Sequence, residues 1–464
     1  MFQALKRLAC LLLLSESLLC AMAQRRVTFV EADRGKMPLI SRTVSIDSRH
    51  DSVYVAYGNE RELAALRALG YRYEALPEPP RPKAATMAHS LEEMRGWDRY
   101  PTYDVYLRMM QAFAEGYPSL CRIDTIGRSA RGRLILCARL SSHALPESAK
   151  PQFFYSSTMH GDEVAGYHLM LHLIDTLLSG YGHNMLHTRL LDSLQVFVNP
   201  LSNPDGTYAG GDSTVAFAQR YNAHMVDLNR NFPDPFGTPP LDAVQPENEA
   251  MMAYAAAHRF RMGANLHGGS EVLNYPWDSF ESRERRHPSW RWWQRVCGKF
   301  IDTLRAAQSV AFDGVAPEGY IAGGDWYVIP NGRQDYMNAT LGVLEVTMEI
   351  SNVKLLSASR LPAYWAALQR PLVNYMHSAL ADTTFRRPLA APVVARPCVR
   401  VSPNPCAGET SLSMPAPAPL TLFDLRGCPA ATFPAGTQRL SLPLPNGAYV
   451  LRCGTARSVI VIAR

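Results

Sequence analysis

Two short segments that lie far apart in the chain carry residues able to bind a catalytic metal ion. His160 and Glu163 belong to residues 158–163, and His267 follows about a hundred residues later in residues 265–270. Two imidazoles and one carboxylate form the three-ligand set of a catalytic zinc, whose fourth position stays open for water. We therefore predict that these three side chains bind one Zn²⁺ per catalytic domain, and that the pKa of water bound there falls to about 7.

The flanking residues predict elements that hold these ligands at the edge of a sheet. Residues 153–158 are typical of a buried strand, and residues 164–178 carry apolar side chains at helical spacing. His160 and Glu163 then lie on a strand-to-helix turn, where open α/β sheets bind ligands. Residues 261–266 predict a short strand that ends at His267.

A second pair of residues has the same spacing without this context. His89 and Glu92 also stand three positions apart, but a polar, Glu-rich stretch surrounds them and no strand precedes them. A His and a Glu at this spacing arise by chance about once in a chain of this length. We do not expect this pair to bind metal.

A hydrolase also needs groups that hold the substrate and stabilise developing charge. Arg220, Asn229 and Arg230 supply two guanidinium groups and one amide. A planar guanidinium grips a carboxylate through two hydrogen bonds, which suits recognition of a peptide's free C-terminus. Without the metal set, these residues would be interpreted as solvated loop residues.

Residues 341–350 form a strongly apolar run that predicts a buried strand with two carboxylates. Buried carboxylates are costly unless they are paired or functional. Glu345 and Glu349 lie on one face of such a strand because its side chains alternate. This pattern leaves open which of them is the general base, although the end of the strand, at Glu349, favours catalysis.

Together these motifs resemble the zinc carboxypeptidases, in particular their regulatory (N/E-type) branch, from about Tyr103 to Ala381. Further matching segments are residues 126–129, 132–133, 203–206, 227–233, 324–327 and 334–336. The resemblance implies an α/β fold in which helices cover both faces of a mixed central sheet. It assigns zinc ligation to His160, Glu163 and His267, polarisation of the scissile carbonyl to Arg220, binding of the terminal carboxylate to Asn229 and Arg230, catalysis as general base to Glu349, and a structural role to Glu345.

The resemblance also suggests which terminal residue the site prefers. Asp278 stands eleven residues after His267, where the N/E branch has the acidic residue that meets a basic terminal side chain. We therefore expect a preference for C-terminal Lys or Arg. Arg333 replaces the usual Met, and a cation lining the same pocket would oppose this preference.

One position departs from the family pattern. Two residues after the segment 334–336 the family normally has a mobile tyrosine that closes over the substrate, and this chain has Asn338. Tyr336 occupies the preceding aromatic position and is the phenol expected to reach the substrate instead.

Composition sets the limits of the chain's organisation. At 464 residues it is too long for one ordinary domain, and its net charge of +6 is spread without a basic block. This distribution gives no reason to expect nucleic acid or a membrane surface as partner, and we expect a monomer without a transmembrane segment. The predicted parts are a signal peptide at 1–23, a propeptide-like unit with a Pro-rich linker at 24–82, the catalytic domain at 90–382, a linker at 383–397 and a β-sandwich at 398–464.

The ends of the chain predict export. Residues 1–23 have the charged start, apolar run and small-residue cleavage site of a secretory signal. Residues 401–405, 423–427 and 446–449 resemble the C-terminal sorting domain of bacterial type IX secretion, which would make that machinery a partner. The expected location is outside the cell or on its surface, reached through the periplasm. Export permits disulfides, and candidates are Cys121 with Cys137 and two bridges among the four tail cysteines, in any of three pairings.

Two alternatives to a secreted carboxypeptidase acting on peptides remain at this level. A cell-wall peptide carboxypeptidase would share the fold, but Asp278 argues against it. A surface binding module that has lost activity is favoured by Asn338, whereas Glu349 and Arg220 oppose it. Hydrolysis of short peptides that end in Arg, Leu or diaminopimelate, measured with and without chelator, distinguishes the three.

Overall fold

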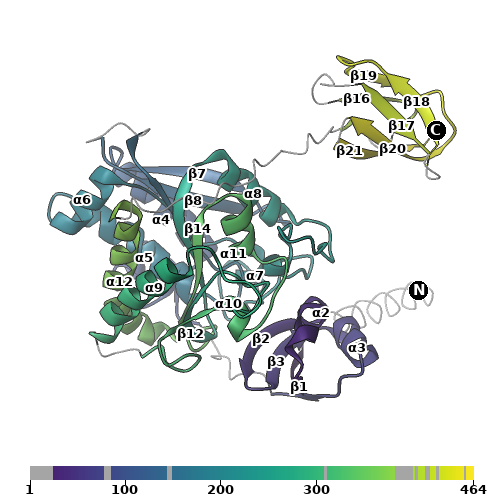
Figure 1. The fold of residues 1–464 in the computed structure, drawn as a ribbon. Coiled ribbons are helices and arrows are strands. Elements are labelled where there is room, and N and C mark those ends of the chain that lie inside the picture. The colour runs from purple at the N-terminus through teal and green to yellow at the C-terminus, as the bar shows by residue number, and fades with distance from the viewer. Residues whose placement is uncertain are drawn as a thin grey trace, which may run out of the picture. The chain divides into compact units, whose positions relative to one another are not determined.

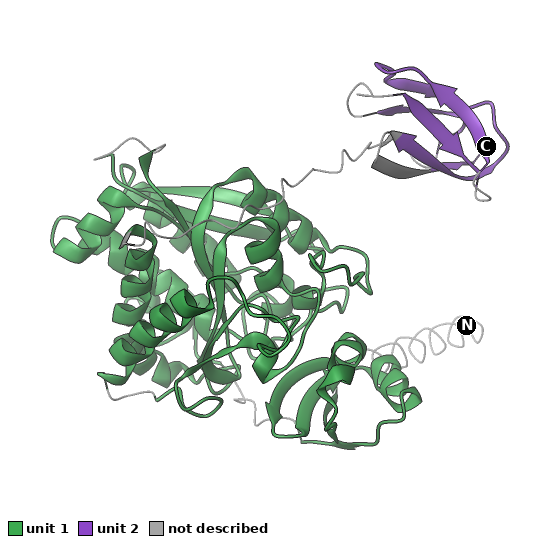
Figure 2. Ribbon diagram, viewed as in Figure 1, with its two compact units in different colours: residues 1–388 green, residues 389–464 purple. Residues whose placement is uncertain are grey.

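The chain folds into two compact units in this computed structural model, residues 1–388 and residues 389–464 (Figure 2). The structure describes residues 25–77, 85–143, 149–307, 311–381, 401–402, 406–412, 419–424, 428–453 and 456–463. The predicted signal peptide and the linker at 383–397 lie outside these residues. No helix among the described residues is long and apolar enough to span a membrane.

An eight-stranded mixed sheet forms the centre of the first unit, in the order β13-β12-β14-β11-β9-β10-β8-β7 (Figure 1). Its strands are β7 (Cys121–Arg128), β8 (Leu134–Leu140), β9 (Gln152–Ser157), β10 (Gln195–Asn199), β11 (Phe260–His267), β12 (Ser270–Tyr275), β13 (Tyr320–Ala322) and β14 (Leu344–Ser351). Strands β10, β9, β11 and β14 run parallel, and β7 and β8 pair antiparallel with their neighbours. Strand β12 pairs antiparallel with β14 and parallel with β13. The strands predicted around the metal ligands are confirmed.

Helices cover both faces of this sheet, as predicted. One face is packed by α4 (Tyr103–Gly116), α5 (Ala165–Gly180), α6 (Met185–Ser193), α9 (Trp290–Arg305) and α12 (Leu361–Ala381), and the other by α8 (Pro246–Ala257) together with α11 (Arg333–Asp335) and η5 (Tyr336–Thr340) (Figure 1). Side chains of β9 alternate between the two cores: Phe153 and Tyr155 enter the first, and Phe154 enters the second. Because both faces are buried, polar groups are expected only where the strands end.

The N-terminal part of the first unit is a small α/β structure with its own core. Its elements are β1 (Arg25–Val30), η1 (Arg34–Lys36), α2 (Met37–Thr43), β2 (Ser45–His50), β3 (Val53–Gly58), α3 (Glu60–Ala68) and β4 (Tyr73–Ala75). The four strands form an antiparallel sheet in the order β2-β3-β1-β4, which leaves β2 at one edge.

This N-terminal part packs against the segment that carries α10 (Gly323–Trp326) (Figure 1). Arg34 donates from Nη2 to the carbonyl oxygens of Gly324 and Asp325, each at 2.8 Å. Arg49 donates to the carbonyl of Trp326 at 2.8 Å, and Val328 joins the buried core of the N-terminal part. The two parts therefore share an interface within one compact unit.

The second unit consists of two antiparallel sheets over a common apolar core. Its strands are β15 (Val401–Ser402), β16 (Glu409–Leu412), β17 (Leu420–Phe423), β18 (Pro429–Phe433), β19 (Arg439–Ser441), β20 (Gly447–Cys453) and β21 (Ala456–Ile462). The sheet orders are β15-β16-β19 and β18-β17-β20-β21. Leu412 and Leu440 from one sheet and Leu422 and Leu451 from the other are buried together. The predicted β-rich tail is confirmed.

The expected Cys121–Cys137 disulfide does not form. Strands β7 and β8 form an antiparallel pair, but their register sets Cys121 opposite Leu140 and Cys137 opposite Asp124. The two thiols are therefore not cross-strand neighbours, and both are free and buried. Of the four tail cysteines, Cys398 and the side chain of Cys453 lie outside the described residues.

Candidate metal centre

The three predicted ligands converge at the carboxyl ends of adjacent parallel strands. His160 and Glu163 follow β9, and His267 ends β11, which pairs with β9. Nδ1 of His160 lies 3.0 Å from one carboxylate oxygen of Glu163, and Nδ1 of His267 lies 2.8 Å from the other. The two Nδ1 atoms are 3.1 Å apart. These three residues could hold a metal ion, and all are buried.

The local backbone explains how the turn brings two ligands to one point. Gly161 separates them, and a Cβ at this position would lie 2.4 Å from the backbone of Gly206. The turn therefore packs directly against the short helix α7 (Pro204–Thr207). Nδ2 of Asn203, the N-cap residue of this helix, donates to the carbonyl of Met159 at 3.1 Å. Only glycine permits this close approach of two backbones.

The surrounding groups suit a metal ion. Nε2 of His160 donates to Oδ1 of Asp227 at 3.1 Å, which leaves Nδ1 with its lone pair directed at the site. Nε2 of His267 lies 2.7 Å from the Asn265 amide. Burial lowers the pKa of His267 to about 4, so its ring is neutral, as a ligand must be. Although burial opposes ionisation, the neighbouring His160 and His267 hold the pKa of Glu163 well below its usual value.

Of the two carboxylates on β14, only one faces the site. Glu349 is paired in register with His267 on the adjacent parallel strand and lines the cavity around the ligands. Its Oε2 is buried and has no hydrogen-bond partner within the described residues. Burial, and then the charge of Glu163, raise the pKa of Glu349 well above its usual value. The carboxylate is therefore a good proton acceptor beside the ligands.

Glu345 is instead part of a buried ion pair. Its two oxygens accept from Nε and Nη2 of Arg333 at 2.8 and 2.9 Å. Both side chains are 1% exposed. Arg333 therefore does not line the cavity as the sequence suggested, because this bidentate contact turns its guanidinium into the protein. Arg333 thus does not oppose the binding of a C-terminal Lys or Arg, contrary to the expectation from the sequence.

Arg220 lies beside the ligand atoms. Its Nη1 is 3.1 Å from Nδ1 of His160 and 3.3 Å from Oε1 of Glu163. On its other side, Nη2 pairs with Oδ2 of Asp227 at 3.1 Å, and Nε donates to the hydroxyl of Ser45 at 2.8 Å. The guanidinium is thus held in a fixed position beside the ligand atoms of His160 and Glu163.

Asp227 is a functional residue that the motif contained but the sequence analysis did not assign. One oxygen accepts from Nε2 of His160 and from the backbone N–H of Asn229, and the other contacts Arg220 and the Ser45 hydroxyl. Although burial opposes ionisation, the neighbouring Arg220 guanidinium holds the pKa of Asp227 well below its usual value. The sequence signal for such a role was its position two residues before Asn229.

Two residues that follow Asp227 present donors to the cavity. Asn229 and Arg230 both line this cavity. Nε and Nη2 of Arg230 are buried and have no hydrogen-bond partner within the described residues. Oδ1 of Asn229 accepts from the backbone N–H of Arg333 at 2.9 Å, which fixes the orientation of the amide. Buried guanidinium donors of this kind favour an anionic ligand.

Asp278 lines the cavity, as do Asn274, Ile329 and Thr347. Oδ1 of Asp278 accepts from Nε2 of Gln334 at 2.7 Å. Burial, and then the charge of Asp335, raise the pKa of Asp278 well above its usual value.

The tyrosine of this cavity is not at the expected position. Asn338 is buried and donates to the carbonyls of Gln334 and Glu345, and Tyr336 packs against Phe232 in the second core. Neither lines the cavity, because η5 turns both into the protein. Tyr327 lines it instead, and burial followed by the charge of Glu349 raises its pKa. The Trp326-Tyr327 motif was its only sequence signal.

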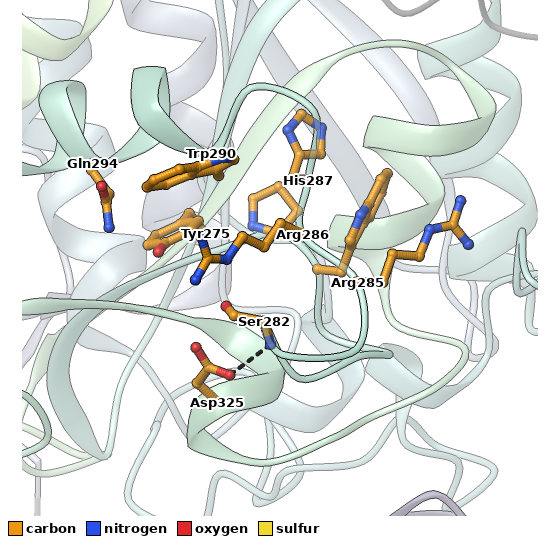
Figure 3. A pocket seen from close by; sticks show the side chains of 10 residues that line it. Tyr275, Ser282, Arg285, Arg286, His287, Trp290, Gln294 and Asp325 are labelled. Atoms are coloured by element: carbon orange, nitrogen blue, oxygen red, sulfur yellow. Dashed lines mark hydrogen bonds between the residues drawn. The ribbon is translucent and has the colours of Figure 1, made fainter.

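A second cavity of about 130 Å³ is lined by residues that include Tyr275, Arg286 and Trp290 (Figure 3). The Asp325 side chain accepts from the backbone of Ser282 at 2.7 Å there (Figure 3). Among the described residues, the only cluster of metal-binding side chains is the one at His160, Glu163 and His267. The second cavity is therefore not the metal centre. The decoy residues are also separate, with Glu92 pairing with Arg95 at 2.9 Å.

This fold and this ligand set agree with the comparisons to known proteins. The chain belongs to the zinc carboxypeptidase family, because the family model matches residues 106–370. Carboxypeptidase D of Rattus norvegicus is 34% identical over 289 residues, which cover 60% of this chain and 21% of that protein. Carboxypeptidase M of Mus musculus is 31% identical over 293 residues, which cover 60% of this chain and 65% of that protein.

The chain thus spans about a fifth of the length of carboxypeptidase D. Its homologues include regulatory-type carboxypeptidases. A solved carboxypeptidase A from Helicoverpa armigera shares the fold, with a TM-score of 0.62 and 18% identity, covering 78% of this chain and 98% of that chain. The metal of the family is zinc.

We expect purified protein to contain one zinc ion, and we expect His267→Ala to lose it because a ligand and its contact to Glu163 disappear together. Metal analysis after dialysis measures this. His89→Ala, which changes the exposed decoy histidine, should retain zinc. Stoichiometric zinc in His267→Ala would contradict the ligand assignment.

Proposed function

We propose that this protein is a zinc-dependent carboxypeptidase that removes the C-terminal residue of peptides. The observation that carries the proposal is one cavity lined by the His160, Glu163 and His267 set, by Glu349, and by the unpartnered donors of Arg230. Zinc bound by the three ligands supplies Lewis-acid polarisation and a lowered pKa for water. The remaining chemistry belongs to the protein's own side chains.

Glu349 acts as the general base in this proposal. Its raised pKa and its unpartnered oxygen make it a proton acceptor next to His267. The proton it accepts is later available to the leaving amine. Arg220 stabilises the negative charge that develops on the carbonyl oxygen, and Asp227 with Ser45 holds the guanidinium in place.

The substrate's terminal carboxylate is bound by Asn229 and Arg230. A guanidinium with two unpartnered nitrogens matches the two oxygens of a carboxylate. Tyr327, which lies on the same cavity, takes the substrate-closing role that the sequence assigned to position 338. The alternative of an inactive binding module rested on Asn338, which lacks the phenol. Because Tyr327 supplies a phenol in this proposal, Asn338 no longer favours that alternative.

Glu349→Gln should lower kcat by about 10² to 10⁴-fold while zinc stays bound, since the amide keeps the shape but cannot accept a proton. Hydrolysis of a peptide ending in Arg, normalised to bound zinc, measures this. Glu345→Gln is the control on the same strand. Equal losses of kcat per folded, zinc-loaded molecule would show that the two carboxylates do not differ in role.

We further propose a preference for C-terminal Lys or Arg, read by Asp278. A buried carboxylate that lines the cavity strengthens charge-assisted hydrogen bonds to a cation and disfavours an apolar side chain that leaves it unpaired. The homologous carboxypeptidases D and M support this preference by analogy. A cell-wall peptidase has less support because diaminopimelate ends in a zwitterion rather than a simple cation.

Asp278→Asn should reduce the ratio of kcat/KM for matched peptides ending in Arg and in Leu by about 10- to 100-fold. The raised pKa of Asp278 adds a pH dependence. Raising the pH ionises the carboxyl, so the wild-type ratio should rise with pH and the variant ratio should not. A wild-type preference for Leu, or a preference for Arg that survives the substitution, would mean that Asp278 does not recognise the substrate.

The N-terminal part, residues 24–82, is proposed to be a propeptide. The support is its position on the cavity: Ser45 contacts both Arg220 and Asp227, and Asp47 lines the cavity itself. The linker that follows is rich in proline.

Replacing residues 78–84 with the recognition sequence of a specific protease allows the full chain to be cut at this linker. We expect activity on a peptide ending in Arg to rise at least about tenfold after cutting and dissociation of the N-terminal part, because the cavity becomes open. The same protease on the unmodified chain is the control. Full activity before cutting would refute the propeptide role.

For residues 398–464 we propose a type IX sorting domain, which implies a secreted or surface-attached protein. The support is the β-rich second unit together with the tail motifs in the sequence. A chain that ends at Pro388 should keep peptidase activity and should accumulate in the periplasm of a type IX secreting host. Surface localisation of this truncated chain, detected by fractionation, would remove the proposal.

A further inference from the structure

Asp278 and Asp47 both line the cavity but have different neighbours. Asp278 contacts Gln334. Asp47 instead pairs with Lys354, whose Nζ lies 3.9 Å from Glu163. If the proposed function holds, a peptide whose terminal side chain meets Asp278 places the residue before the scissile bond elsewhere in the cavity. The groups found there therefore bear on which peptides the enzyme prefers.

Lys354, which pairs with the cavity-lining residue Asp47, has an unusual environment. Lys354 Nζ lies 2.8 Å from Oδ1 of Asp47 and 4.4 Å from the centroid of the Tyr57 ring. Its other ion-pair contacts among the described residues are long, at 3.8 Å to Asp162 and 3.9 Å to Glu163. The Lys354 side chain is 12% exposed. The close contacts thus come from the N-terminal part alone.

Gly269, which lines the cavity, leaves room for this lysine beside Asp47. Its φ of +114° is a conformation that L side chains rarely adopt, and a Cβ there would lie 3.3 Å from Cε of Lys354. The nearest atom of Asp47 would be 4.0 Å away. A side chain at position 269 would therefore crowd the lysine and the carboxylate that pairs with it.

Removal of the N-terminal part takes away both Asp47 and the Tyr57 ring. The Lys354 ammonium then keeps only its two long contacts to carboxylates among the described residues. The ammonium uncovered by this removal can form a charge-assisted hydrogen bond with an anionic side chain of a substrate. The position that the Asp47 carboxylate leaves is on the cavity that the substrate enters.

We propose that Lys354 forms a subsite for an acidic side chain on the residue that precedes the scissile bond, and that Asp47 occupies this subsite in the uncut chain. This inference rests on the proposed carboxypeptidase function and adds a second specificity to it. The favoured substrates end in Glu-Arg, Asp-Arg, Glu-Lys or Asp-Lys. Asp47 imitates the acidic side chain of such a peptide.

The test uses the full chain carrying the cleavable linker, cut and freed of its N-terminal part, with bound zinc measured in every sample. Matched blocked dipeptides ending in Glu-Arg and Gln-Arg differ only in the charge of the residue before the scissile bond. The wild-type ratio of kcat/KM should favour Glu by roughly tenfold, as for one charge-assisted hydrogen bond. Lys354→Met should bring this ratio close to one, and Lys354→Arg should keep most of it.

A loss of kcat/KM by the same factor for both peptides in Lys354→Met, with the ratio unchanged, would overturn the subsite and leave only a structural role. A wild-type ratio of one would also overturn it, although hydrolysis itself would uphold the proposed function. Hydrolysis of neither peptide by zinc-loaded, cut protein would refute the carboxypeptidase function and this inference with it.

The uncut chain gives a second readout. Asp47→Asn should raise activity before cutting, because the N-terminal part loses its short ion pair with Lys354. Asp51→Asn is the matched control, since Asp51 is exposed in the turn between β2 and β3. Equal activity of these two variants before cutting would contradict occupation of the subsite by Asp47.

Discussion

The Glu163 carboxylate between two imidazoles is the interaction on which the rest of the site depends. It gathers His160 and His267 from two strands at the edge of a sheet whose faces are both buried. Polar groups are costly in such a place unless each has a partner. Side chains around the ligands provide such partners. Asp227 accepts from Nε2 of His160 and pairs with the guanidinium of Arg220.

The same requirement separates the two carboxylates of β14. Glu345 has a bidentate partner in Arg333, whereas Glu349 keeps one buried oxygen without a partner within the described residues. A carboxylate that is fully paired stabilises the fold but has little reason to accept a proton. A carboxylate with a raised pKa and an unpartnered oxygen is suited to acid–base chemistry. Both residues are glutamates, so the contacts around each carboxylate account for the difference in their roles.

The interface between the N-terminal part and the catalytic core reuses groups that the proposed chemistry needs. Ser45 binds the guanidinium of Arg220 and the carboxylate of Asp227, and Asp47 pairs with Lys354 near the metal ligands. In the proposed function, a segment that contacts these groups would compete with substrate for the same cavity. The same contacts therefore cover the site and stabilise its charged residues. They also join the N-terminal part to the catalytic core within one compact unit.

The sequence by itself determined the elements and the ligand set. Alternation and helical spacing predicted the strands and helices, and parallel strands must end at a common edge, so His160, Glu163 and His267 were expected to meet. Only the tertiary structure decided which phenol enters the cavity, because η5 turns Tyr336 and Asn338 into the protein while Tyr327 lines the site. The register of β7 and β8 excluded a disulfide, and the partner of Arg333 removed it from the cavity. Each of these outcomes depends on where a side chain points and on what it contacts across the fold, which local sequence patterns do not encode.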